Sequence, residues 1–271
     1  MHWSNHLKKA SLTVAVSAAV AVLGSAPGAR AATIKWGRAT DVSGDANVST
    51  AGTLVSAYSC YGGSPIVSPI VNGVTFTGLA VANGNLTTFP GGTITSSGGM
   101  TSFSNYNNSS GAYGPPPTFP SNYSKEYQTL LNSAFYSSTP ADPLILTLKK
   151  LTPGREYQFE AWVNDARSLA ASRTEKLSGK VGNSVTLAYY TGKLGAGQVV
   201  LGIFTADSSG HQVITFTGIG HTSPQINAFQ LRAIPVPGNR NQAKKDVRVS
   251  GVVLSPANVA GNRPRAKNPV K

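Results

Sequence analysis

The 271-residue sequence predicts an all-β fold, a single jelly-roll-like β-sandwich of about ten strands with one short helix. Short runs rich in Val, Ile, Thr and aromatic residues recur between Gly, Pro, Asn and Ser clusters, which is the pattern of strands and turns. Only 12% of the residues are charged, and the chain holds 29 Gly and 17 Pro. This composition suits an all-β extracellular protein better than a cytosolic helical enzyme.

The chain divides into a signal peptide (1–31), a β-sandwich domain (32–234) and a disordered basic tail (235–271). Lys8 and Lys9 precede the apolar run "LTVAVSAAVAVLG", and the small residues Ala29 and Ala31 mark a cleavage site after Ala31. The apolar run is shorter than the roughly 20 residues that a membrane span needs. We therefore expect an exported protein, secreted or held at the cell surface or in the periplasm, without a transmembrane segment after cleavage.

The formal charge of +13 is unevenly distributed. Residues 1–31 carry +3, residues 32–234 carry 12 basic and 9 acidic side chains (+3), and residues 235–271 carry 8 basic and 1 acidic (+7). The tail is rich in Pro, Asn and Arg, which predicts a solvated segment or a contact with an anionic envelope polymer. It has no aromatic residue, so it lacks the stacking groups of single-strand nucleic-acid binders, and no nucleic-acid partner is expected.

The strand signals follow one another along residues 32–234. One cysteine, Cys60, excludes an intrachain disulfide and is expected at a strand end, half buried. The predicted strands lie at 33–37, 52–59, 73–81, 91–97, 143–150, 155–164, 183–190, 197–206, 211–218 and 225–234.

One helix is predicted in "SKEYQTLLNSAFY". Five residues at helical spacing form one apolar stripe, namely Tyr127, Leu130, Leu131, Ala134 and Phe135. Ser124 is the expected N-cap, and Glu126 suits the first turn. Before this helix, residues 98–123 form a Gly-, Asn-, Ser- and Tyr-rich stretch that is too long for an ordinary loop.

The stretch "LTPGREY" matches the Leu-x-Pro-Gly-x-x-Tyr corner of fibronectin type III domains, in which the Tyr hydroxyl bonds backbone upstream. Such a domain needs only about 100 residues, so a larger jelly roll fits the lengths on either side of Tyr157 better.

Several blocks together resemble a family of secreted bacterial β-sandwich proteins, many of which carry a PEP-CTERM sorting tail. These blocks are "TIKWGRATDVSGDANVSTAGTLVSAYS", "VNGVTFTG", "LTPGREYQFEAWVNDAR", "GQVVLGIFTAD" and "INAFQLRAI". The resemblance implies a sandwich similar to galactose-binding-like and carbohydrate-binding modules. The chain departs from the family after "RAIPVPG", where a basic tail replaces the sorting motif.

The strand 155–164 supplies the candidate binding site. Alternation points Tyr157, Phe159, Ala161 and Val163 toward the core. The opposite face carries Glu156, Gln158, Glu160, Trp162 and Asn164. An indole among amides and carboxylates can stack on a sugar while the polar groups bond its hydroxyls. The alternative is that a loop covers Trp162 and the ring simply packs.

Further candidates flank this strand. Asp165 and Arg167 pair with each other or reach a ligand at the rim. Gln230 and Arg232 share one face of the last strand and would join the Trp162 face if the two strands are neighbours. The expected ligand-binding set also includes Tyr113, because Tyr among Ser, Gly and Asn is typical of adaptable binding loops.

No cofactor is expected, and only a weak calcium candidate exists. Asp41, Asp45 and Asn47 lie close together in "TDVSGDANVST", and oxygen ligands at such spacing can hold calcium. The full loop pattern is absent, so an Asx-rich turn is the favoured interpretation.

The sequence favours a non-catalytic function. It contains neither a Gly-x-Ser-x-Gly elbow nor a His-Glu-x-x-His zinc motif. Glu156 and Glu160 share a strand face but lie about 13 Å apart, too far for a glycosidase pair. We expect an exported binding module for extracellular polysaccharide or another envelope polymer. The alternatives are a structural cell-envelope or matrix protein and a glycan-acting hydrolase.

Overall fold

The computed structural model describes residues 32–62, 64–81, 84–103, 119, 121–165, 172–191 and 196–235. The predicted signal peptide and nearly all of the predicted tail lie outside these residues. Within them the fold is all-β with one α-helix, so the predicted fold class is confirmed. No helix of the described residues is long and apolar enough to cross a membrane.

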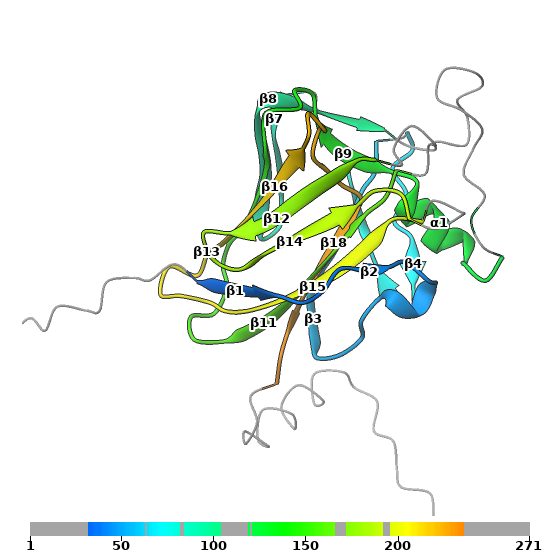
Figure 1. The fold of residues 1–271 in the computed structure, drawn as a ribbon. Coiled ribbons are helices and arrows are strands. Elements are labelled where there is room, and N and C mark those ends of the chain that lie inside the picture. Colours follow the sequence, from blue (N-terminus) through cyan, green and yellow to red (C-terminus); the bar gives the residue numbers. More distant parts are fainter. Residues whose placement is uncertain are drawn as a thin grey trace, which may run out of the picture.

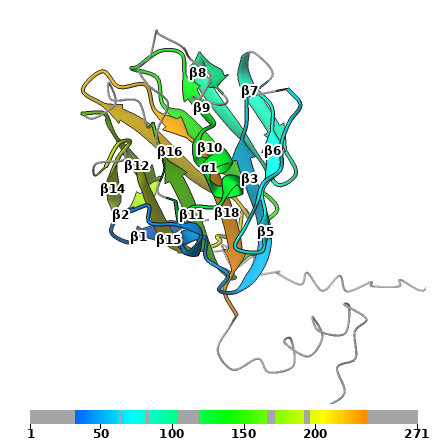
Figure 2. The ribbon, with the colours of Figure 1, turned by 90° about the vertical axis from the view of Figure 1, so that its right-hand side faces the viewer.

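Two 8-stranded sheets face each other and form the sandwich (Figures 1 and 2). The first sheet has the order β13 (Val181–Gly182), β1 (Thr33–Trp36), β15 (Gln198–Thr205), β11 (Glu156–Val163), β18 (Ala228–Ala233), β3 (Thr53–Cys60) and β6 (Thr77–Leu79), with β2 (Thr40–Asp41) beside β15. The second has the order β14 (Ser184–Ala188), β12 (Thr174–Gly179), β16 (Gln212–Ile219), β10 (Leu144–Leu148), β8 (Gly92–Phe103), β9 (Ala134–Ser137) and β17 (Gln225–Ile226), with β7 (Gly84–Phe89) beside β8. A separate ribbon joins β4 (Ile70–Val71) to β5 (Val74–Thr75).

The chain crosses repeatedly between the sheets, as in a jelly roll. Strand β10 of the second sheet leads to β11 of the first, and β15 of the first leads to β16 of the second. At the end of the body, β17 lies at the edge of the second sheet and β18 in the middle of the first, with only Asn227 between them. Strands far apart in sequence therefore become neighbours.

Each of the ten predicted runs contains a strand. Six strands lie outside these runs, namely β7, β9, β12 and the two-residue strands β2, β4 and β13, so the count of about ten was too low. The sequence of β12, "TEKLSG", is mostly polar and therefore gives little strand signal, although Leu177 and Glu175 both point inward and are buried.

The main core lies between the sheets. The predicted inward residues Tyr157, Phe159, Ala161 and Val163 are all buried in it, which confirms the alternation of β11. Ring contacts join the two layers. The ring centroid of Phe229 on β18 lies 5.5 Å from that of Phe89 on β7. Cys60 ends β3 and is fully buried in this core, not half buried as expected.

A second apolar cluster lies on the other face of the first sheet. Trp162 and Ala228 are its members on β11 and β18. Helix α1 (Lys125–Leu131) covers them with Tyr127, Leu130 and Leu131, and the ribbon beside it adds Val71, Val74 and Phe76. Part of the first sheet is therefore buried on both faces. In Figure 1, α1 lies beside β4 at one side of the sandwich.

The helix begins as predicted but ends earlier. The Ser124 side chain accepts a 3.0 Å hydrogen bond from the Tyr127 backbone N–H, and Glu126 lies in the first turn. The prediction was wrong for Ala134 and Phe135, which belong to β9. The sequence can form the apolar stripe, but pairing with β8 and β17 stabilises a strand there instead.

The predicted tyrosine corner is present. The hydroxyl of Tyr157 accepts a 2.9 Å hydrogen bond from the backbone N–H of Thr152. This bond ties the turn before β11 to the strand that follows it.

Candidate functional site

The expectation of an open ligand surface around Trp162 is wrong. The Trp162 side chain is 0% exposed, and its indole N–H donates to the Tyr127 hydroxyl at 3.1 Å. Its ring meets Phe76 edge-on, with centroids 5.6 Å apart. The alternative interpretation, that the ring is covered and packs, describes the structure. The covering elements are mainly α1 and the β4–β5 ribbon.

The polar part of this face is also covered. Strands β11 and β18 are neighbours, with Gln158 opposite Arg232 and Glu160 opposite Gln230. The expected juxtaposition is therefore present, but it holds protein backbone. Glu160 accepts hydrogen bonds from the Ser49 backbone N–H at 3.1 Å and from the Gln230 side-chain amide. Burial raises the pKa of Glu160 to about 7, although Gln230, Ser49 and Arg232 act in the opposite direction.

Arg232 fixes the backbone that crosses this face. Its guanidinium donates to the carbonyl oxygens of Thr50, Ala51 and Gly52 at 2.8–3.0 Å. The N–H donors of one planar guanidinium group thus bind three successive backbone carbonyls. Gln158 is half-buried, and its side-chain nitrogen has no partner in the structure. The polar side chains of this face thus hold residues 49–52 on the sheet.

Asn164 and Asp165 are both fully buried at the end of β11. The Asn164 amide donates to the carbonyl of Leu131 at 3.3 Å, and Asn227 donates to the same oxygen at 2.8 Å. The two asparagines thereby bond the end of α1. Asp165 forms a 2.6 Å ion pair with Arg173. The other expected partner, Arg167, lies outside the described residues, as does Tyr113.

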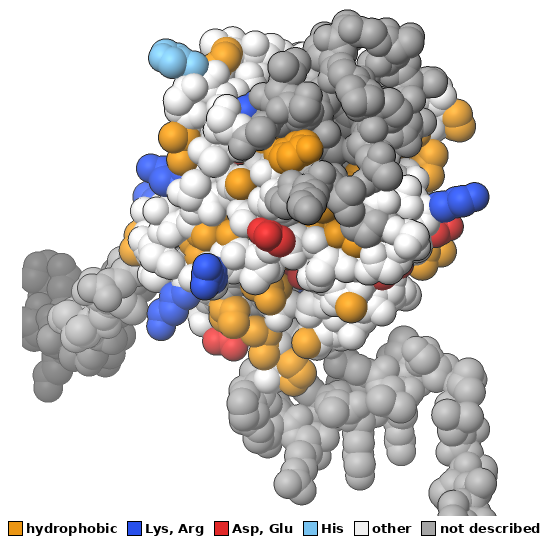
Figure 3. All heavy atoms as spheres, turned by 45° about the vertical axis from the view of Figure 1, so that its right-hand side comes forward, with side chains coloured by type: hydrophobic (Ala, Val, Ile, Leu, Met, Phe, Trp, Pro, Cys, Tyr) orange, Lys and Arg blue, Asp and Glu red, His pale blue; other side chains and the backbone are white. Residues whose placement is uncertain are grey.

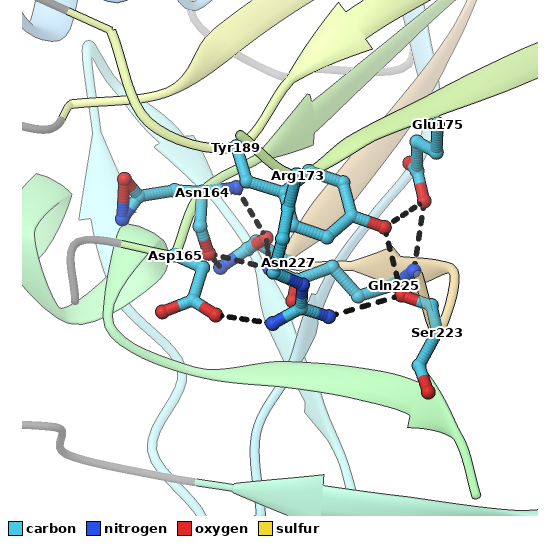
Figure 4. Close-up of polar contacts among 8 residues, drawn as sticks. All are labelled: Asn164, Asp165, Arg173, Glu175, Tyr189, Ser223, Gln225 and Asn227. Atoms are coloured by element: carbon cyan, nitrogen blue, oxygen red, sulfur yellow. Dashed lines mark hydrogen bonds and ion pairs between the residues drawn. The ribbon is translucent and has the colours of Figure 1, made fainter. Parts of the chain in front are cut away.

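Asp165 belongs to a buried polar network between the sheets (Figure 4). Arg173 also donates to the carbonyl of Ser223 at 3.2 Å and lies over the ring of Tyr189, 4.9 Å from its centroid. The Tyr189 hydroxyl lies 2.6 Å from the carboxylate of Glu175, which also accepts the backbone N–H of Gln225 at 2.8 Å. No spacing in the sequence indicates this network, because its residues are far apart along the chain.

The network holds a fully buried acid with a raised pKa. Glu175 is fully buried, and desolvation raises its pKa to about 8, against hydrogen bonds from Tyr189 and Gln225 and the nearby Arg173. The Tyr189 hydroxyl faces both Glu175 and the Ser223 carbonyl but has one proton to give. The Glu175 carboxylate and the Ser223 carbonyl are therefore two acceptors that share this one donor.

The residues of the calcium candidate contact separate protein groups. Asn47 accepts the backbone N–H groups of Ser43 and Gly44, which is the behaviour of an Asx-rich turn. The other two side chains point to different donors: Asp45 to the Ser124 backbone N–H and Asp41 to the Gln198 amide. No group of three metal-binding side chains occurs among the described residues. Calcium binding here stays a prediction.

An aromatic pair that the sequence analysis did not select lies partly open to solvent. Phe103 at the end of β8 and Tyr136 on β9 are half-buried. Their centroids lie 5.7 Å apart with 32° between the ring planes. Tyr136 pairs directly with Thr101, and its neighbour Phe135 points into the core. The two rings therefore lie on the outer face of the second sheet.

Hydroxyl groups lie beside Tyr136 of this pair, and an amide lies further along β8. Thr101 and Ser138 share a 2.7 Å hydrogen bond at the surface, and each hydroxyl keeps further capacity to donate or accept. The exposed Asn85 amide reaches the Ser97 carbonyl at 3.3 Å on the neighbouring strand pair. Phe103 directly precedes the Tyr-rich part of 98–123. Period-two spacing puts Thr101 and Phe103 on one face of the strand, and this is the signal that could have found this surface.

The surface of the described body is largely uncharged. On the face drawn in Figure 3, Lys and Arg side chains are few, and most of the described surface is uncharged. This distribution agrees with the formal charge of only +3 over residues 32–234. The excess basic charge of the chain lies in its two ends.

Comparisons with known proteins add little. No protein-family model matches the chain, and no curated protein matches it, so the family suggested by the sequence stays a prediction. Among solved structures the chain is similar to Xyl-CBM35 in complex with a disaccharide that contains glucuronic acid. The identity is 12%, the TM-score is 0.26, and the match covers 37% of this chain and 78% of that one. At this TM-score the likeness carries no argument about this chain.

Proposed function

We propose that this protein is an exported, non-catalytic module that binds carbohydrate through the Phe103–Tyr136 surface. The main observation in support is that the half-buried rings of Phe103 and Tyr136, with 32° between their planes, lie beside surface hydroxyl groups. Aromatic rings supply contact area at little conformational cost, and adjacent hydroxyls can bond the polar edge of a sugar. The predicted partner, an extracellular polysaccharide, fits such a partly exposed surface.

The proposal moves the binding site away from Trp162. A sugar ring stacks only on an aromatic face that it can reach, and Trp162 is completely covered. The second sheet presents its aromatic pair outward and rests on a rigid scaffold, since Phe135 beside it is packed in the core. Scaffolded surfaces lose less freedom on binding than mobile ones.

The test is a glycan and polysaccharide binding panel with the exported product of the full chain. We expect Tyr136→Ala and Phe103→Ala each to weaken binding at least about tenfold, the equivalent of about 1.4 kcal/mol. Leu86→Ala is the matched control, because it removes an exposed apolar side chain from β7 of the same sheet. Binding that survives both ring substitutions would disprove the site. Absence of binding to the whole panel would disprove the function.

A second candidate is the structural envelope protein. Leu201 and Ile203 on β15 are 41% and 42% exposed, and both lie on the outer face of the first sheet. Ile203 pairs with Lys35 of β1. Such a face could join copies of this chain. Sedimentation of the parent protein and of the Ile203→Lys variant separates the two candidate functions. A concentration-dependent oligomer that the substitution dissociates favours the structural function.

A further inference from the structure

A pocket lies where the start of the body meets two turns. Ala32 before β1, Lys180 before β13, and the β15–β16 turn with Asp207 and Ser209 line it. Its volume is about 300 Å³. His211 and Gln212 complete the polar lining. The candidate surface described above lies on other strands, so this pocket needs its own explanation.

Asp207 is held in place at the pocket wall. Its carboxylate accepts the backbone N–H of Ser209 at 2.8 Å and the hydroxyl of the same residue. The Gly210 backbone N–H donates to the Asp207 carbonyl at 3.1 Å, which closes the turn. The Asp207 carboxylate is therefore oriented before any ligand arrives.

Ala32 brings its backbone nitrogen to this carboxylate. The Ala32 backbone N–H, with the groups of Ser209 and His211, bonds Asp207 and lowers the pKa of its carboxyl. Ala32 is 7% exposed and belongs to the main core, so the nitrogen is fixed in position. The same nitrogen follows the small-residue site Ala29-x-Ala31 in the sequence.

Gln212, which also lines the pocket, has a side-chain acceptor without a partner. Gln212 is 2% exposed, and its side-chain nitrogen donates to the Val213 carbonyl at 2.8 Å. Its side-chain oxygen is buried and has no partner in the structure. A buried amide oxygen without a donor lowers the stability of the fold. A backbone N–H has only one proton to donate. An ammonium group with three N–H bonds could serve several acceptors at once.

We propose that cleavage between Ala31 and Ala32 creates an α-ammonium group that binds the Asp207 carboxylate, making this pocket the binding site of the mature N-terminus. The cleavage is a hydrolysis by a peptidase that accepts small residues. Water adds its oxygen to the Ala31 carbonyl carbon as the C–N bond breaks. The freed amine takes a proton and becomes the ammonium group.

The charges around this group decide its pKa. Asp207 favours the protonated amine, while Lys180 and His211 in the pocket lining act against it when they are charged. Asp207 is the nearest of the three, because it already contacts the Ala32 nitrogen. We therefore expect the pKa of the α-amino group to lie above its ordinary value of about 7.7–8.0.

The test begins with the product exported from bacteria that express residues 1–271. Intact mass and N-terminal sequencing should give a chain that begins at Ala32. NMR titration of the ¹³C-methylated α-amine should show the raised pKa, and Asp207→Asn should return it to the ordinary range. Asp142→Asn, which removes a carboxylate far from this pocket in sequence, should leave it raised.

A chain that begins at Ala31 is the positional control. It keeps an α-amino group but displaces it by one residue, up to about 3.6 Å. Its amine should titrate in the ordinary range. An exported chain with a different first residue would overturn the proposal, and so would an α-amine pKa that Asp207→Asn leaves unchanged.

Discussion

The indole N–H of Trp162 donates to the hydroxyl of Tyr127 at 3.1 Å, and both side chains are 0% exposed. This contact joins the middle of the first sheet to helix α1. A residue that the sequence presented as a possible ligand-binding group is thus the centre of a second core. The contact also predicts how substitutions at this position behave.

Trp162→Ala should destabilise the fold by about 3–5 kcal/mol, because it leaves a large cavity beneath α1. Trp162→Phe should cost less, since it keeps most of the ring but leaves the Tyr127 hydroxyl without its donor. Urea denaturation of both variants measures the effect. Leu201→Ala, at an exposed position of the same sheet, should remain within about 0.5 kcal/mol of the parent protein. A Trp162→Ala protein as stable as the parent would mean that the ring is not buried.

The stability of the protein should fall as pH rises from about 4.5 to about 8. Burial raises the pKa of Glu175 to about 8 and that of Glu160 to about 7, both from 4.5. The folded protein therefore holds protons that the unfolded chain has released. Each group lowers the free energy of unfolding by at most about 1.4 kcal/mol per pH unit within its window.

Glu175→Gln isolates the larger of these contributions. The glutamine keeps the shape of the side chain but cannot ionise. The free energy of unfolding should therefore fall less steeply between pH 5 and 8. Thermal or urea unfolding at several pH values measures it. Glu126→Gln, at an exposed position in α1, should leave the slope as it is. An unaltered slope in Glu175→Gln would show that Glu175 is ionised in the folded protein.

Arg232→Met should release the segment 49–52. The substitution removes the donors to Thr50, Ala51 and Gly52 but retains the alkyl part of the side chain. Hydrogen bonds from charged groups contribute about 1.5–3 kcal/mol each where no other donor replaces them. We expect a total loss of about 2–3 kcal/mol, less than the sum of three such bonds, because Thr50 and Ala51 are exposed and water can replace the lost donors. Hydrogen exchange of the Ser49 amide should accelerate. Lys35→Met, on an exposed side chain of the same sheet, should change neither quantity.

Tyr157→Phe should cost about 1 kcal/mol, the usual net value of one hydrogen bond. The Thr152 N–H loses its acceptor, while the ring remains stacked on Phe204 at 5.6 Å. Urea midpoints at constant m-value give the difference. Tyr136→Phe supplies the comparison, because Tyr136 is half-buried at the surface and should show a smaller change.

The period-two pattern of "EYQFEAWV" was enough to predict which side of β11 faces the main core. The pattern could not predict that a second layer covers Trp162 on the other side, since that layer comes from 42–48, 71–76 and 119–131. A half-exposed face and a face covered by distant segments have the same sequence pattern. Glu175 and Tyr189 were missed for a related reason, because a buried network is assembled by strand order and not by spacing.

The helix boundary shows a competition between local and distant effects. The stripe from Tyr127 to Phe135 has helical spacing, but Phe135 gains a strand partner on each side of β9. Short helices are marginal by themselves, so sheet pairing prevails beyond Leu131. Likewise, the surface formed by Phe103 and Tyr136 depends on this pairing and cannot be read from either segment alone.

The position of β18 sets the order in which the body can be completed. This strand comes last along the chain yet lies between β11 and β3. Until residues 228–233 have been synthesised, those two strands have no partner at the centre of the sheet, and the seam between them stays open. Folding of the first sheet must therefore finish after synthesis of nearly the whole body. The last strand of the body thus acts as the closing piece of the first sheet, and a chain truncated before residue 228 would lack the centre of that sheet.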